Sequence, residues 1–163
     1  REMHRLTDTK IVLITNATRL DKPAVQQAID RLHDHGGEVW AKLDAGTQAW
    51  FEKLDRPRGG LTLDGITQQI IAQSQRHPLV IQSMFLQIDG HPPPQSEVAA
   101  YRDRIAGMLK AGAQITGVQL YTLARPPAET NLSALPSDQM DALAQCVREA
   151  VGEVPVLVFY APE

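Results

Sequence analysis

Short apolar runs alternate with helical segments along this chain, and this alternation constrains its fold more than any other feature. The runs are rich in β-branched residues and lie at residues 11–15, 38–44, 79–88, 117–124 and 155–160. Between them, apolar residues recur at helical spacing, and Gly, Pro, Ser or Asp residues mark the helix ends. Strands that alternate with helices predict an α/β fold with a parallel sheet.

The composition is that of one domain and excludes several kinds of site. With 163 residues, 43% of them hydrophobic, we expect a single domain over residues 1–163. The lone cysteine, Cys146, excludes an internal disulfide and a self-contained iron–sulfur site. A net charge of -3 and 5% aromatic residues do not favour nucleic acid binding. No apolar stretch could span a membrane, so we expect a cytoplasmic protein that does not bind a membrane.

The connections differ in length at the two ends of the predicted strands. Segments that lead from a helix into a strand are short, whereas those that lead from a strand into a helix are long and often rich in proline. Functional sites of parallel α/β folds lie at the carboxyl ends of the strands, in barrels and open sheets alike. The sequence therefore predicts the site at this edge, and leaves both arrangements open.

Polar or sulfur-containing side chains alternate with aliphatic ones in three consecutive predicted strands. They are Lys42 and Asp44, then Gln82 and Met84, then Gln119 and Tyr121. A parallel strand covered on both faces reads as nearly continuous hydrophobic residues. Here one face is aliphatic and the other needs polar partners, which favours a ligand-holding lumen. We predict a partial parallel βα barrel of about five β-α units.

Four segments resemble the radical S-adenosylmethionine (radical SAM) family: ITN, VWAKLDAGT, PLVIQSMFLQ and GVQLYTLARPPAE. They are most similar to its iron–sulfur oxidoreductases related to wyosine-type tRNA-modifying enzymes. The resemblance implies the C-terminal portion of a (β/α)6 barrel that cleaves SAM reductively, so that a radical abstracts a substrate hydrogen. It also implies a [4Fe-4S] cluster held by a CxxxCxxC motif, which this chain lacks. We expect the chain to be a fragment, inactive alone, whose parent supplies the cluster.

The resemblance also implies roles for individual residues. Four of them match positions that face SAM, and three others match positions nearer to an unknown substrate. The SAM-facing residues are Asn16, Lys42, Asp44 and Gln82, and those toward the substrate are Gln119, Tyr121 and Arg125. An RNA substrate is implied by the resemblance alone.

Other interpretations of these residues stay open. Lys42 could be a catalytic Schiff-base lysine in a barrel lyase, or it could form a structural ion pair with Asp44. Gln82 and Gln119 could bind only each other. The whole chain could instead be a non-catalytic module that binds a nucleoside or a protein partner, or that associates with itself through exposed sheet edges. The histidines at 33 and 35 lie at a helix end, where the helix dipole explains them without a metal.

Overall fold

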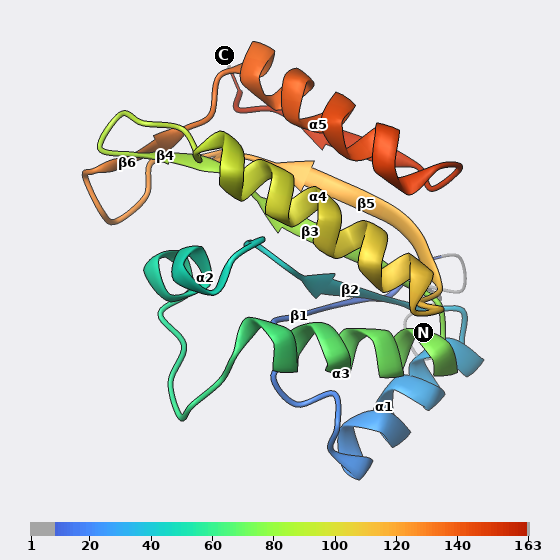
Figure 1. Ribbon diagram of the computed structural model, residues 1–163. Helices are drawn as coiled ribbons and strands as arrows, with labels where there is room; N and C mark the ends of the chain where they lie inside the picture. Colours follow the sequence, from blue (N-terminus) through green and yellow to red (C-terminus); the bar gives the residue numbers. More distant parts are fainter. Residues whose placement is uncertain (1–8, 163) are drawn as a thin grey trace.

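The computed structural model describes residues 9–162, in which the predicted strands and helices alternate as expected (Figure 1). The strands are β1 (Val12–Thr15), β2 (Glu38–Lys42), β3 (Leu79–Met84), β4 (Leu86–Ile88), β5 (Ile115–Tyr121), β6 (Leu132–Ala134) and β7 (Val156–Phe159). The helices are α1 (Pro23–Asp34), α2 (Gln48–Leu54), α3 (Leu63–Arg76), α4 (Gln95–Lys110) and α5 (Ser137–Val151). None of the helices in this part of the chain is long and apolar enough to cross a membrane.

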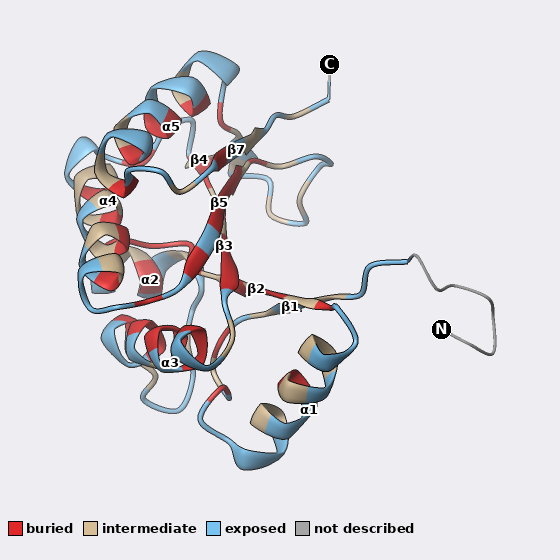
Figure 2. Ribbon diagram, turned by 90° about the vertical axis from the view of Figure 1, so that its right-hand side faces the viewer, coloured by how far each residue is buried: buried red, intermediate tan, exposed pale blue. Residues whose placement is uncertain are grey.

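Five strands form one parallel sheet in the order β1-β2-β3-β5-β7, which is also their order along the chain. Right-handed crossovers between successive neighbours place the connecting helices on one face of a sheet. A doubly wound sheet instead reverses its order at a switch point and carries helices on both faces. Seen along its edge, this sheet has α3, α4 and α5 on the same side (Figure 2). The order and the layering support a partial barrel.

The helix-covered face of the sheet is aliphatic, as predicted. Ala41, Ile81, Val118 and Val156 lie side by side in register across four strands, and all four are buried. Every second residue of a strand points to the same face, so their neighbours in sequence lie on the opposite one.

The opposite face is polar at its centre and apolar at its edges. Lys42, Gln82 and Gln119 are in register there, next to Leu157 of the edge strand β7. At the edges, Ile14 of β1 and Leu157 are each 52% exposed. This pattern agrees with the predicted alternation of polar and aliphatic side chains.

The structure corrects the predicted strand at residues 79–88. The chain leaves the large sheet after β3, and β4 pairs in antiparallel fashion with β6 in a separate two-stranded sheet. The break falls at Phe85, which is 1% exposed and packs edge-on against Tyr101 of α4. The segment predicted as a long loop after β5 therefore contains a strand, β6.

Serine residues near the start of two helices do not cap them. Ser96 and Ser137 lie inside α4 and α5, respectively. The residues that precede the helices are Pro94 and Pro136, with extended ψ angles of 151° and 150°. Proline has a fixed φ and can set the entry angle of the chain without a side-chain hydrogen bond.

Candidate functional site

Lys42 lies at the carboxyl end of β2 and contacts two of the residues predicted to share its face. Its Nζ is 2.9 Å from Asp44 Oδ2 and donates a hydrogen bond of 2.5 Å to the Tyr121 hydroxyl. The ammonium also lies 5.1 Å from the centre of the Tyr121 ring. The structure thus brings together three predicted site residues from two non-adjacent strands.

Asp44 acts on Lys42 from a buried position. Its side chain is 2% exposed, and its second oxygen, Oδ1, accepts a hydrogen bond of 2.7 Å from the backbone N–H of Met84. Burial raises the pKa of Asp44, and the charge of Lys42 opposes that rise. Both carboxylate oxygens are engaged, so Asp44 orients Lys42.

The surroundings of Lys42 favour its charged form. Burial alone would lower the pKa of Lys42, but the charge of Asp44 and the hydrogen bond to Tyr121 outweigh burial and raise that pKa. A Schiff-base lysine attacks a carbonyl as the neutral amine and is activated by a lowered pKa. The environment of Lys42 therefore opposes the lyase interpretation and favours a charged ammonium.

The segment that follows Asp44 is fixed by a close approach to α4. A Cβ at Gly46 would lie 2.1 Å from the backbone nitrogen of Tyr101, so only glycine fits there. Glu97, 2% exposed, accepts hydrogen bonds from the backbone N–H groups of Gly46 and Thr47, and from the Thr47 hydroxyl at 2.6 Å. Thr47 in turn caps α2 by accepting from the N–H of Trp50.

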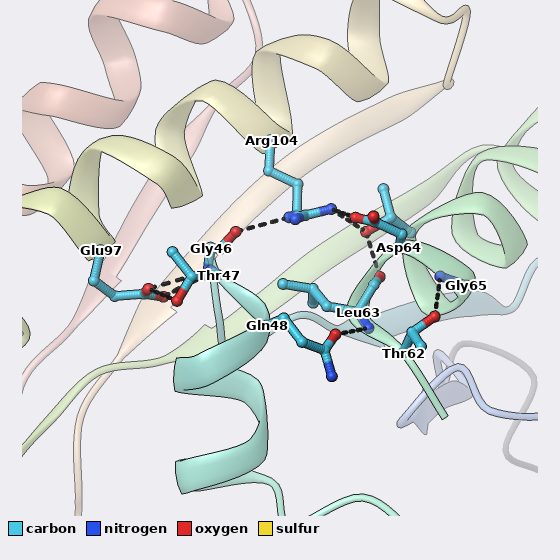
Figure 3. Close-up of polar contacts among 10 residues, drawn as sticks. Gly46, Thr47, Gln48, Thr62, Leu63, Asp64, Gly65, Glu97 and Arg104 are labelled. Carbon is cyan, nitrogen blue, oxygen red and sulfur yellow. Dashed lines mark hydrogen bonds and ion pairs between the residues drawn. The ribbon is translucent and has the colours of Figure 1, made fainter. Parts of the chain in front are cut away.

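Arg104 of α4 joins the start of α2 to the start of α3 (Figure 3). Its guanidinium donates to the carbonyl of Gly46, to Asp64 and to the Thr67 hydroxyl. Gln48 adds a second link, since its side-chain oxygen accepts from the N–H of Leu63. These contacts hold α2 and the following loop over the carboxyl ends of the first two strands.

A cavity of about 260 Å³ opens between these strand ends and the segment from α2 to α3. Its polar and charged lining comes from Asn16, Thr18, Lys42, Asp44, Asp55, Arg56 and Arg58. Its apolar lining comes from Leu43, Phe51, Pro57, Leu61, Leu63 and Ile66. The cavity lies at the edge of the sheet where the sequence predicted a site.

Asp55, which directly follows the last residue of α2, was not among the predicted site residues. Desolvation by the cavity wall raises the pKa of Asp55 to about 7; repulsion from Asp44 adds to the rise and Lys42 opposes it. The residue as a whole is exposed to solvent. A signal existed, because an acidic residue at a helix C-terminus opposes the helix dipole.

The remaining predicted residues divide between this cavity and other places. Asn16 lines the cavity, and its side-chain oxygen accepts a 2.9 Å hydrogen bond from the Thr18 hydroxyl. Gln82 donates a 3.3 Å hydrogen bond to Gln119, as one interpretation predicted, and neither lines the cavity. Arg125 is exposed and lines a separate hollow near the C-terminal segment, so the structure does not bring it to Lys42.

The chain does not offer ligands for an iron–sulfur cluster. Its one cysteine, Cys146, lies in α5, and no group of three or more His, Cys, Asp or Glu side chains within residues 9–162 could hold a metal ion. A [4Fe-4S] cluster needs thiolate ligands. The residues present do not fit this cofactor.

No protein family and no curated protein matches the sequence. Among solved structures, a radical SAM methyltransferase from Sphaerobacter thermophilus matches with a TM-score of 0.55 and 17% identity, over 91% of this chain and 40% of that one. A domain of pyruvate-formate lyase-activating enzyme from Bacteroides vulgatus ATCC 8482 matches with a TM-score of 0.60 and 9% identity, over 91% of this chain and 97% of that one.

At these identities the likeness shows the fold: the chain has the α/β fold of radical SAM neighbours, which confirms the predicted fold class. It spans about two fifths of the length of the methyltransferase. The relation to wyosine-type enzymes stays a prediction.

Proposed function

We propose that this chain forms part of the SAM-binding wall of a radical SAM enzyme, with Lys42 as the main contact for the cofactor. One observation carries the proposal: an ammonium held in its charged form by a buried carboxylate faces a cavity at the carboxyl edge of the sheet. SAM carries a carboxylate, for which a lysine is a suitable partner. The cavity also has apolar walls, as sites for small organic molecules do.

The neighbouring residues would support this contact in different ways. Asn16 lines the same cavity and presents a side-chain amide to a ligand. Asp44 positions Lys42 and Tyr121 limits its movement through a hydrogen bond. Gln82 and Gln119 lie further along the open face, where we place the substrate side of the site. An RNA substrate stays a prediction from the family resemblance.

The half-exposed apolar side chains of the edge strands support the idea that this sheet is covered in the intact parent. Leu157 and Phe159 of β7 are 52% and 48% exposed, and Ile14 of β1 matches them at the other edge. Unpaired edge strands commonly add further strands or associate. We propose that further strands of the parent lie beside them, and that cluster ligands come from that part of the parent.

Calorimetric titration of the full chain with SAM tests the proposal. Saturable binding is expected, and Lys42→Gln should weaken it at least tenfold while circular dichroism shows an unchanged fold. Lys53→Gln is the matched control, because Lys53 lies on α2 outside the cavity lining and should leave the affinity unchanged. An absence of binding, or equal binding by the Lys42 variant, would contradict the proposal.

A further inference from the structure

The charged residues on the two sides of the cavity differ in whether they have an ion-pair partner. On the sheet side, Lys42 and Asp44 neutralise each other in direct contact. On the opposite side lies Asp55, whose carboxyl group has no hydrogen bond or ion pair with any residue between 9 and 162. A carboxyl group that lines a cavity without a protein partner is free to take one from a ligand.

The basic residues next to Asp55 do not neutralise it. Arg56 instead donates two hydrogen bonds, of 2.8 and 2.7 Å, to the carboxylate of Glu129 in the loop after β5. Arg58 lines the cavity but makes no ion pair with Asp55. The Arg56 guanidinium is therefore engaged by Glu129, and the Asp55 carboxyl group has neither arginine as a partner.

We propose that Asp55 is a ligand-contacting residue of this cavity, and that in its ionised form it pairs with a positively charged group of the ligand, which in SAM is the sulfonium and not the α-ammonium. The inference rests on the proposed function, since it concerns the same cavity. The inference adds a ligand preference to the proposed function: the cavity should bind a cationic ligand more tightly than a neutral one of the same shape.

Proton binding to Asp55 then competes with the ligand. The pKa of Asp55 is raised to about 7 by desolvation and by Asp44, with Lys42 opposing, and the Tyr121 phenol is the other titratable group that interacts with it. No histidine of the described chain lines the cavity. The ionised fraction of a group with a pKa of 7 rises about tenfold between pH 6 and pH 8, so the affinity for a cation should rise by about the same factor.

SAM and S-adenosylhomocysteine provide a matched pair of probes, because the second lacks the methyl group and the sulfonium charge. Calorimetry should show SAM binding about tenfold tighter at pH 8 than at pH 6, and S-adenosylhomocysteine changing less than twofold. Asp55→Asn should abolish the pH dependence for SAM and leave the other ligand unchanged. Glu52→Gln, which removes a carboxylate from the same helix outside the cavity lining, should behave as the wild type.

Equal pH dependence for both ligands, or its persistence in Asp55→Asn, would overturn the inference while leaving SAM binding intact. If neither nucleoside binds, the proposed function fails, and phenethylammonium and 2-phenylethanol decide the inference. In NMR titrations at pH 8, preferential shifts of cavity residues with the ammonium compound, lost in Asp55→Asn, would uphold it. Equal shifts, or none, with the two compounds would overturn it.

Discussion

Both ends of the sheet carry charged clusters, and the cluster at the carboxyl ends of the strands lines a cavity. At the amino ends of the strands, the ring of His33 stacks on that of His77 at 4.3 Å. Asp30 accepts a 2.7 Å contact from His77 and pairs with Arg76 at 2.9 Å. At the carboxyl ends, Lys42 and Asp44 form a pair that lines the cavity.

The difference supports the proposal that ligands bind at the carboxyl end and favours a packing role for the amino end. At the amino ends of the strands, Asp30 of α1 binds both Arg76 and His77 at the end of α3, and so ties α1 to α3. At the carboxyl ends of the strands, Asp55 has no hydrogen bond or ion pair with another described residue. The buried Glu97 holds the segment that follows Asp44. Substitutions should therefore affect the two ends differently, in stability, in pH dependence and in binding.

The largest effect is expected at Gly46. A Cβ there would lie 2.1 and 2.6 Å from backbone atoms of α4, which cannot move aside as a side chain can. Gly46→Ala should lower the free energy of unfolding by roughly 3 kcal/mol, measured by urea denaturation. Gly107→Ala is the control: it lies within α4 with open space around it and should raise the stability by about 0.5–1 kcal/mol. A neutral Gly46→Ala would contradict the proposed packing of this segment.

Glu97 should come next. Glu97→Ala removes the acceptor of the backbone N–H groups of Gly46 and Thr47 and of the Thr47 hydroxyl, and should lower the free energy of unfolding by roughly 2 kcal/mol. Glu97→Gln keeps one acceptor oxygen and should lose less. The matching change at the amino ends of the strands is Asp30→Ala. It breaks an exposed ion pair and should change the urea midpoint far less. Equal losses at both ends would remove the contrast between them.

Ionisation of Asp55, at the carboxyl ends of the strands, should make the folded chain less stable as the pH rises. Its pKa is about 7 in the folded chain and ~3.8 when unfolded. The folded chain thus binds the proton more tightly, and this contribution to stability is lost between about pH 4 and pH 7. Asp55→Asn should raise the melting temperature relative to wild type at pH 8 and change it little at pH 4. Equal shifts at both pH values would show that Asp55 titrates normally.

His33 should give the smallest effect, with the opposite sign. Burial, and then the charge of His77, lower the pKa of His33 in the folded chain, while nearby acidic residues oppose this. The unfolded chain therefore binds the proton more readily, and stability falls as the pH drops below about 6.5. His33→Phe keeps a ring on His77 without the titration, so it should lose less melting temperature than wild type between pH 7.5 and 5.5. If His33→Phe loses as much melting temperature as the wild type, a group other than His33 causes the pH dependence.

Features that repeat along the chain could be predicted from the sequence, whereas contacts that join distant segments could not. Strand alternation correctly placed Lys42, Gln82 and Gln119 in one row, because a period of two is a local property. The contact of Glu97 with Gly46 spans 51 residues, and no local pattern indicates it. Asp55 has a local signal in its position at a helix C-terminus, but its desolvation and the repulsion from Asp44 arise only in the fold.

The boundaries of β3 and β4 also depended on tertiary contacts. The apolar run at residues 79–88 reads as one strand, but the buried contact of Phe85 with Tyr101 ends its pairing in the large sheet. The family resemblance implied that Arg125 lies toward the substrate, and the structure places it in a hollow apart from the cavity at the first two strands. Position along a strand predicts the edge of the sheet, and only the course of the loop decides what lies in the cavity.

A ¹H–¹⁵N NMR titration of the full chain with SAM tests the central claim most directly, because it reports on both ends of the sheet at once. The account predicts that backbone shifts concentrate around the cavity, at Asn16, Lys42 and Asp55, and that signals around His33 and His77 stay in place. Shifts centred on the His33–His77 end, or no saturable shifts at the cavity, would contradict it.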